Sequence, residues 1–405
     1  MNLRTPMQWP EGWKDPGVLD LVKGTPIDYL LVPNGPEFDA VRSHAQQLGI
    51  EVGDPGRAPG GIEIVKGSWP GVQWPTNGAG AGPTGVPWVN SNGWLIRLNR
   101  ALHPEIAQWV DGPPPAKSFI DADSYLIAIA DSATHGGRWI VALDEPVAKG
   151  IAVREAKSLA VWKRLTATAA FFAVHKTWTD YSPVGVAGIV SDFTGDNEFF
   201  SHELLNLMGR AGLHYRILPK DRISATSFES LRAVSYTDAT SPSPELRRQI
   251  LQFVQAGGLL IAAPIWGEVA GSPASSPQPG YKVQAVGKGR VALADDVPTD
   301  PYSWAADTAV LVSHRYDLVR FWNSGASRSF YTMSPDRKQA VVHLLFYAER
   351  GPDSATVRVA GRYRAVRGST VDAPKIEDLA IQPQGDGVEV RLPQVSQYVA
   401  LELDV

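Results

Sequence analysis

The stretch SYLIAIADSATHGGRWIVALDEP, residues 124–146, places an apolar helix directly before an apolar strand. Residues 124–137 are typical of a helix that ends at glycine, because Gly136 and Gly137 close the apolar run. Residues 138–144 form a short continuous apolar run, which is typical of a strand buried on both faces of a parallel sheet. This stretch therefore predicts a sheet in which strands alternate with helices.

The same alternation extends over the first part of the chain. Residues 26–34 and 60–67 have the pattern of strands, residues 37–49 that of a helix ending at glycine, and residues 152–178 that of one long helix. A complete eight-stranded (β/α) barrel takes roughly 250 residues, and this region is shorter. We therefore expect residues 1–183 to form an incomplete or distorted (β/α) barrel.

The rest of the chain predicts two further domains. Residues 184–270 alternate strands and helices in a shorter register, which indicates a compact, doubly wound open α/β sheet. Residues 270–280, AGSPASSPQPG, are rich in Ser, Pro and Gly and predict a linker. Residues 281–405 alternate apolar and polar positions between turns, which predicts an antiparallel β-sandwich. The expected fold class is therefore a multidomain α/β protein.

Composition excludes several classes of function. The net charge of -4 over 405 residues provides no basic stripe, so we expect no nucleic-acid partner. The chain has no cysteine, which removes disulfides, thiol nucleophiles and cysteine-ligated metals, and we expect neither a cofactor nor a metal. No apolar run reaches the roughly 20 residues that span a bilayer, and residues 1–14 are polar. These features predict a soluble chain without a membrane partner, either cytoplasmic or exported with a signal peptide absent from this chain.

Three phrases in the second half carry a resemblance to a known family. They are GIVSDFTGDNEFFSHELLNLMGRAGLHYRIL at 188–218, LRRQILQFVQAGGLLIAAP at 246–264 and YTMSPDRKQAVVHLLFYA at 331–348. With VGKGRVAL at 286–293, they resemble the back half of glycoside hydrolase family 42-type β-galactosidases and their relatives. The resemblance implies a barrel followed by a flavodoxin-like domain, which often mediates trimer contacts, and then a β-sandwich. It also implies a carbohydrate ligand and a homo-oligomer.

The chain departs from this family at the residues that carry catalysis. The family pattern places an Asn-Glu pair at the end of one barrel strand and a second Glu at the end of a later strand. In the first two domains, the Asn-Glu pair Asn197-Glu198 lies outside the barrel at the start of a helix, where an acidic residue is favoured by the helix dipole. The resemblance also implies that the flavodoxin-like domain is amidotransferase-like. Glutamine hydrolysis by that fold needs a cysteine thiol, and this chain has no cysteine. We therefore expect that domain to be structural or oligomeric.

Acidic residues at predicted strand ends are the candidate catalytic groups. Asp144 and Glu145 follow the strand 138–144, and neighbouring side chains on a strand point to opposite faces, so at most one of them enters a site. A glycosidase needs a second carboxylate about 5–10 Å away. Glu63, Asp111 and Glu145 are the candidates, and Asp192 would reach the site only across the domain boundary. The alternative is that Asp144 caps the turn that follows it.

Residues 67–105 combine aromatic rings with neutral amides in one segment, a combination that suits a polyhydroxy ligand. The candidate substrate-binding residues are Trp69, Trp74, Asn77, Trp88, Asn90, Asn92, Trp94 and Arg97. The alternative is a long ordered loop whose tryptophans fill gaps between helices.

Two hypotheses follow from the sequence. In the first, the chain is a carbohydrate-active protein related to glycoside hydrolases, with Asp144 as one carboxylate and the segment 67–105 as the sugar-binding surface. In the second, the barrel has lost catalysis, and the chain is a sugar-binding or assembly protein that associates through its flavodoxin-like domain.

Overall fold

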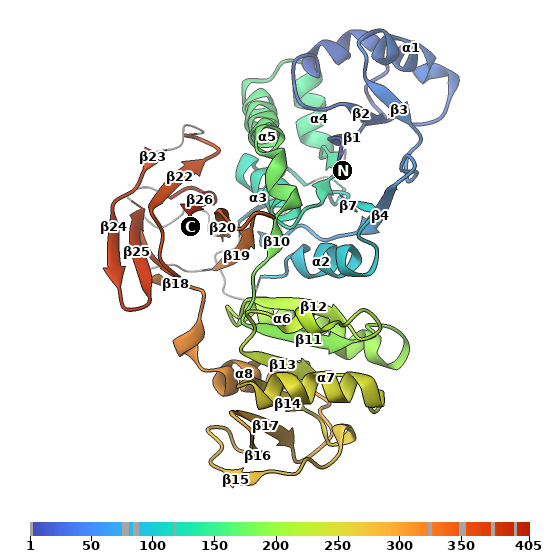
Figure 1. Cartoon of the computed structure of the whole chain (residues 1–405). Coiled ribbons are helices and arrows are strands. Elements are labelled where there is room, and N and C mark those ends of the chain that lie inside the picture. Colours follow the sequence, from blue (N-terminus) through green and yellow to red (C-terminus); the bar gives the residue numbers. More distant parts are fainter. Residues whose placement is uncertain are drawn as a thin grey trace.

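The computed structural model describes residues 3–74, 81–83, 89–116, 118–322, 326–347, 354–373, 377–392 and 395–405. Three units pack against one another, and the chain passes from the first through the second to the third (Figure 1). The fold is mixed α/β, with parallel sheets in the first unit, a largely parallel sheet in the second and antiparallel sheets in the third. Among the described helices, none has the length and apolar character needed to cross a membrane.

Seven strands of the first unit pair in parallel and follow one another in sequence order, and β5 (Val72–Gln73) and β6 (Gly82–Pro83) form a separate antiparallel pair. One sheet has the order β3-β2-β1-β9 and a second has the order β4-β7-β8. Their bounds are Pro6–Gln8 for β1, Tyr29–Leu31 for β2, Glu51–Gly53 for β3, Ile62–Lys66 for β4, Ala107–Asp111 for β7, Arg138–Trp139 for β8 and Val141–Ala142 for β9. The amide of Ile140 donates to the carbonyl of Val110, so β8 and β9 continue into each other and join the two sheets. We call this arrangement the strand ring.

The strand ring has one opening and a filled interior. No pairing joins β3 to β4 in the described residues, so no closed barrel is present there. Trp109 of β7 packs inside the ring against Tyr29, with 5.0 Å between the ring centroids, and against Leu31 and Ile140. These side chains form a small core of their own. The interior of the ring is therefore packed with side chains.

Five helices cover the outside of the strand ring. They are α1 (Asp39–Gln47), α2 (Gly93–Leu102), α3 (Ala122–Thr134), α4 (Glu145–Ala152) and α5 (Ala156–Val174). The single long helix predicted over 152–178 is present as α5, with narrower bounds, because α4 ends at Ala152 and α5 runs from Ala156 to Val174. Arg154 adopts a left-handed conformation (φ 59°), and the amide of Glu155 donates to the carbonyl of Gly150, which ends α4. The segment Lys176–Asp180 after α5 is a 3-10 turn.

The second unit has a seven-stranded sheet in the order β12-β11-β13-β14-β17-β16-β15. The parallel strands are β11 (Ala187–Ser191), β12 (Tyr215–Pro219), β13 (Ala233–Tyr236), β14 (Leu259–Ala262) and β17 (Gly289–Ala294), and their order is that of a flavodoxin-like fold. The antiparallel strands are β15 (Ser272–Ala274) and β16 (Tyr281–Val286). The helices are α6 (Glu198–Arg210), α7 (Pro244–Gln255) and α8 (Pro301–Val312).

This sheet extends beyond the predicted linker. Residues 272–274 pair with β16, and β17 pairs with β14, so residues 281–294 belong to this sheet and not to the sandwich expected from residue 281. Helix α8 follows and packs on the core of the second unit through Trp304. The antiparallel strands that complete the sheet have the same alternating pattern as sandwich strands, which explains the difference.

The third unit consists of two antiparallel sheets, in the orders β10-β19-β20-β26-β22-β23 and β18-β21-β25-β24. The first contains β10 (Ser182–Pro183), β19 (Ser327–Met333), β20 (Gln339–Phe346), β22 (Ala365–Thr370), β23 (Glu377–Asp378) and β26 (Tyr398–Asp404). The second contains β18 (Val319–Trp322), β21 (Ala355–Ala360), β24 (Ile381–Gln384) and β25 (Gly387–Leu392).

Strand β20 is buried on both faces. Val342, Leu344 and Phe346 belong to the core between the two sheets, whereas Val341 and Leu345 belong to the core of the first unit. Successive side chains of a strand point to opposite faces, so β20 connects two cores. The third unit is therefore packed onto α3 and α5 over a continuous apolar surface (Figure 1).

Candidate functional site

Asp144 lies at the junction between β9 and α4 and is fully buried. One carboxylate oxygen accepts the amide of Val147 at 3.0 Å, as an N-cap residue does. The other accepts the amide of Ile120 at 3.2 Å and the hydroxyl of Tyr125 at 3.0 Å. Burial raises the pKa of Asp144, although these hydrogen bonds act in the opposite direction. The contact with Val147 is the one that the helix-capping interpretation predicts, and those with Ile120 and Tyr125 were not expected.

The other predicted catalytic acids lie on the protein surface or near it. Glu145 forms an ion pair with Lys149 one helical turn away, at 2.5 Å, and half of its side chain is exposed. Glu63 is exposed in the middle of β4. Asp111 ends β7 opposite Lys66 of β4 and is half-buried, and burial raises its pKa. At the carboxyl ends of β4 and β7, Asp111 is thus the acid whose ionisation is perturbed.

Two tryptophans of the predicted sugar-binding segment lie together after β4. Trp69 is buried, and its ring lies 5.1 Å from the rings of both Tyr125 and Trp139. Trp74 is 39% exposed and lies with its ring centroid 6.3 Å from that of Trp69. The buried ring of Trp69 therefore packs against the exposed ring of Trp74. The predicted residues Asn77 and Trp88 lie outside the described residues.

The remaining residues of that segment face other neighbours. Asn92 is buried, and its side-chain amide both accepts from and donates to the backbone of Ser68, each at 2.9 Å, which holds the loop after β4. The side chain of Asn90 accepts a hydrogen bond from Asn206 of α6. Two further side chains also turn to the second unit, since Trp94 packs on His202 and Arg97 lies 4.0 Å from the centre of the Tyr215 ring. The predicted sugar-binding segment is therefore divided: Trp69 and Trp74 lie together after β4, whereas Asn90, Trp94 and Arg97 face the second unit.

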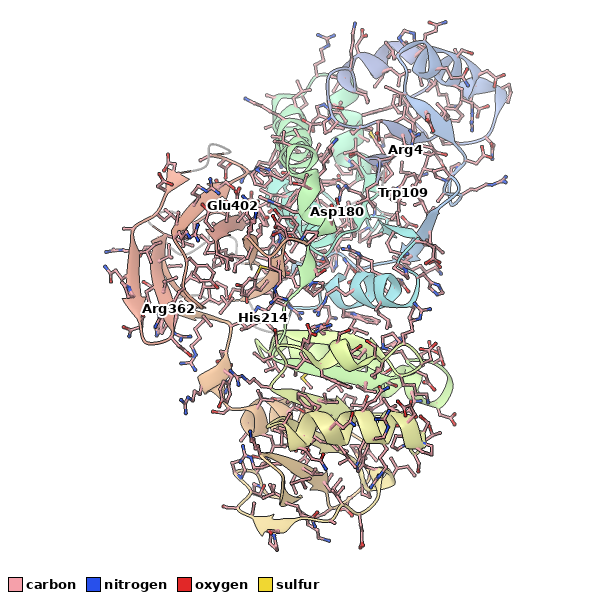
Figure 2. All side chains as sticks on the ribbon, in the orientation of Figure 1. Arg4, Trp109, Asp180, His214, Arg362 and Glu402 are labelled. Atoms are coloured by element: carbon pink, nitrogen blue, oxygen red, sulfur yellow. The ribbon has the colours of Figure 1, made fainter. Side chains whose placement is uncertain are left out.

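A cavity of about 520 Å³ lies where the three units meet. Its walls come from the ends of α2 and α3, the connection 178–185, strand β12 with the turn after it, and the turn between β19 and β20. Figure 2 shows Asp180 and His214 in this central region. Because α2 and α3 end there and lead into β7 and β8, the cavity lies at the amino ends of these strands, opposite the carboxyl ends at which barrel enzymes place their active sites.

Charged residues of this cavity were not found by sequence reasoning, except Arg97. Its lining includes the guanidinium groups of Arg97, Arg100, Arg216 and Arg337 and the carboxylates of Asp180 and Glu229. The two arginines of α2 are three positions apart and share a helix face, which is a signal in the sequence. The other charged residues of the cavity come close to these two arginines only because the three units pack together.

Two buried histidines stand beside these arginines. Burial lowers the pKa of His135 to about 3, with the charges of Arg97 and Arg328 acting in the same direction. Burial and Arg97 lower the pKa of His214 to about 4. Both imidazoles are therefore neutral at neutral pH, and they contribute no charge that would offset or add to the arginines.

Comparison with known proteins identifies similar folds. The α-L-fucosidase isoenzyme 2 of Paenibacillus thiaminolyticus has 10% identity and a TM-score of 0.52, and the alignment covers 96% of this chain and 79% of that chain. The β-galactosidase of Bacillus circulans sp. alkalophilus has 9% identity and a TM-score of 0.50, with 91% and 65% covered. The GH42 β-galactosidase Gan42B of G. stearothermophilus has 11% identity and a TM-score of 0.48, with 77% and 56% covered.

These matches concern the fold. The chain has a glycoside hydrolase-like fold, which the fucosidase and the Bacillus β-galactosidase share over most of its length. It spans between about half and two thirds of the length of the two β-galactosidases. The sequence matches no protein-family model and no curated protein.

Proposed function

We propose that this chain is a carbohydrate-active protein that binds a glycan at the carboxyl end of the strand ring, which we interpret as a degenerate (β/α) barrel. The parallel strands run in sequence order around the ring, as barrel strands do. The glycoside hydrolase-like fold supports the same interpretation. In barrel proteins the loops that follow the strands carry the ligand site, and the loop after β4 is the long one that bears the aromatic residues.

The observation that carries this proposal is the exposed ring of Trp74. Its support, Trp69, is fixed between Tyr125 of α3 and Trp139 of β8, so the platform rests on rigid elements. Such a ring offers a flat apolar face on which the C–H groups of a sugar can stack, with little conformational entropy to lose.

Binding without hydrolysis is the form of the proposal that we favour. A glycosidase requires two carboxylates about 5–10 Å apart that can reach the substrate. The carboxylate of Asp144 is buried and accepts three hydrogen bonds within the first unit, and Glu145 is paired with Lys149 on the surface. In the same proposal the second unit serves association between copies of the chain, since it has no cysteine for amide hydrolysis.

Replacing Trp74 with alanine is expected to weaken glycan binding about tenfold or more, because a stacked ring contributes on the order of 1–2 kcal/mol. The binding glycan is first identified by the increase in melting temperature that neutral oligosaccharides produce, and its affinity is then measured by calorimetry. Trp322→Ala is the matched control, since Trp322 of β18 is 40% exposed but lies on the third unit. Equal affinity of Trp74→Ala and wild type would refute the proposed site.

A second candidate function is hydrolysis with Asp111 as the general acid. The half-buried carboxyl at the end of β7, with its raised pKa, has the character of such an acid. If the wild type hydrolyses any aryl glycoside, Asp111→Asn should lower the rate by roughly 10²- to 10⁴-fold. Glu63→Gln on the neighbouring strand should leave the rate unchanged. Absence of turnover by the wild type across a panel of aryl glycosides would exclude this candidate and leave the binding function.

A further inference from the structure

The cavity between the three units carries an excess of positive charge. Four arginines and two carboxylates line it, which leaves two positive charges uncompensated. In the part of the chain that the structure describes, no ion pair involves Arg97, Arg100, Arg216 or Arg337. Arg97, Arg100 and Arg216 are partly buried, whereas Arg337 is exposed. Opposite charges are normally found beside partly buried guanidinium groups, so the absence of an ion pair at the first three indicates a missing anion.

Neutral groups hold these arginines in place. Arg97 donates to the carbonyl of Tyr215 at 2.6 Å, and its buried Nε has no hydrogen-bond partner among the described residues. Arg100 donates to the carbonyls of His135 and Thr179 at 3.0 and 2.7 Å. Carbonyl oxygens position a guanidinium group but do not neutralise its charge. Arg97 and Arg100 are therefore oriented in advance of any ligand, which reduces the entropy lost on binding.

Hydroxyl groups and aromatic rings complete the walls. Six serine and threonine residues line the cavity, and three aromatic side chains border it. The serines and threonines are Thr134, Ser182, Thr226, Ser230, Thr332 and Ser334, and the aromatic residues are Trp178, Tyr181 and Phe330. Hydroxyls both donate and accept, as recognition of sugar hydroxyls requires, and rings offer apolar faces. The lining thus combines groups for an anion with groups for a polyol.

We propose that this cavity binds an acidic saccharide of one or two uronic acid residues, with its carboxylates held by the arginines. A volume of about 520 Å³ lies within the range of sites for small ligands. The planar guanidinium group matches a carboxylate in a two-pronged arrangement. The site is separate from the ring of Trp74, so this inference does not depend on the function proposed above.

Calorimetric titration of the full chain tests the proposal. Galacturonate and digalacturonate are compared with galactose, which has the same ring without the carboxylate, and with inorganic sulfate. We expect the uronates to bind and galactose to bind at least tenfold more weakly, with uronate affinity falling as salt concentration rises. Equal binding of galactose, or binding of sulfate but of no uronate, would overturn the assignment.

Variants in the cavity locate the binding and give effects of opposite sign. Arg216→Gln and Arg337→Gln should each weaken digalacturonate binding about tenfold, the size expected for a hydrogen bond to a charged group. Glu229→Gln should strengthen it, by about threefold, because it removes a like charge from the lining. Arg362→Gln is the matched control, since this exposed arginine lies on the third unit and is not among the residues that line the cavity.

Two outcomes of the variant series would contradict the proposal. One is unchanged affinity in both arginine variants with melting temperatures like that of the wild type. The other is an equal loss in Arg362→Gln, which would indicate non-specific attraction. Trp74→Ala should leave uronate affinity unchanged, so failure of this site and failure of the glycan site at the carboxyl end of the ring give different results.

Discussion

Replacing Asp144 with alanine is expected to lower the free energy of unfolding by about 3–5 kcal/mol. The carboxylate accepts hydrogen bonds from the amides of Ile120 and Val147 and from the hydroxyl of Tyr125, and all of these groups are buried. Its removal leaves three buried donors without their partner and deletes the cap of α4. Chemical denaturation followed by circular dichroism measures the loss as a lower transition midpoint.

Glu145→Ala is the matched control, because this neighbouring acid is exposed and pairs with Lys149 on the surface. Its effect should stay within about 1 kcal/mol, as is usual for surface ion pairs. Similar losses in the two variants would show that the buried hydrogen bonds of Asp144 contribute little. Such a result would also reopen a role of Asp144 in catalysis.

The second large effect is a loss of stability between pH 7.5 and pH 5. Burial lowers the pKa of His135 and of His343 to about 3 and that of His214 to about 4, whereas an unfolded histidine titrates near 6.5. The unfolded chain therefore takes up protons first as the pH falls, and the folded chain loses stability from pH 6.5 downward. At pH 5 each histidine costs roughly 2 kcal/mol, or roughly 6 kcal/mol together.

Denaturation curves at several pH values between 5 and 7.5 check this expectation. The three histidines should contribute a fall of about 4 kcal/mol per pH unit near pH 5.5, which corresponds to three protons, whereas Asp131 and Asp144, whose pKa values burial raises, act in the opposite direction. His214→Gln should reduce that slope by one third, because the imidazole whose Nε2 meets Ser329 no longer titrates. His103→Gln, at an exposed position, should leave the slope as it is. A slope that is the same in all three proteins would contradict the assignment.

Much of the local structure could be predicted from the sequence, because it depends on neighbouring residues. The run 138–144 forms the strand pair β8 and β9, and helix α3 ends before Gly136 as expected. The letters Asp-Glu-Pro at 144–146 are those of a helix start, with an N-cap followed by proline in the first turn. Capping by Asp144 was one of the two interpretations that the sequence allowed, and the contact of Asp144 with Val147 is that of a cap.

Features that depend on how distant segments pack could not be predicted. Strand β16 begins with alternating apolar and polar residues, as sandwich strands do, and only its pairing with β17, which in turn pairs with β14, shows which sheet contains it. The cavity brings Arg216 and Arg337 beside the arginines of α2, although more than a hundred residues separate each from that helix. The sequence carries no local signal for which strands pair or for which residues come together where the units pack.

The double burial of β20 has a consequence for synthesis of the chain. Helix α5 ends at Val174, but Val341 and Leu345, which cover the apolar face of the first unit, are made much later, and their partner strand β26 comes at the end. At translation rates of about 5–20 residues per second, that face waits on the order of 10–40 s for its cover. A ribosome-bound nascent chain would thus expose this apolar face throughout that interval. Binding of a chaperone to that face would prevent aggregation.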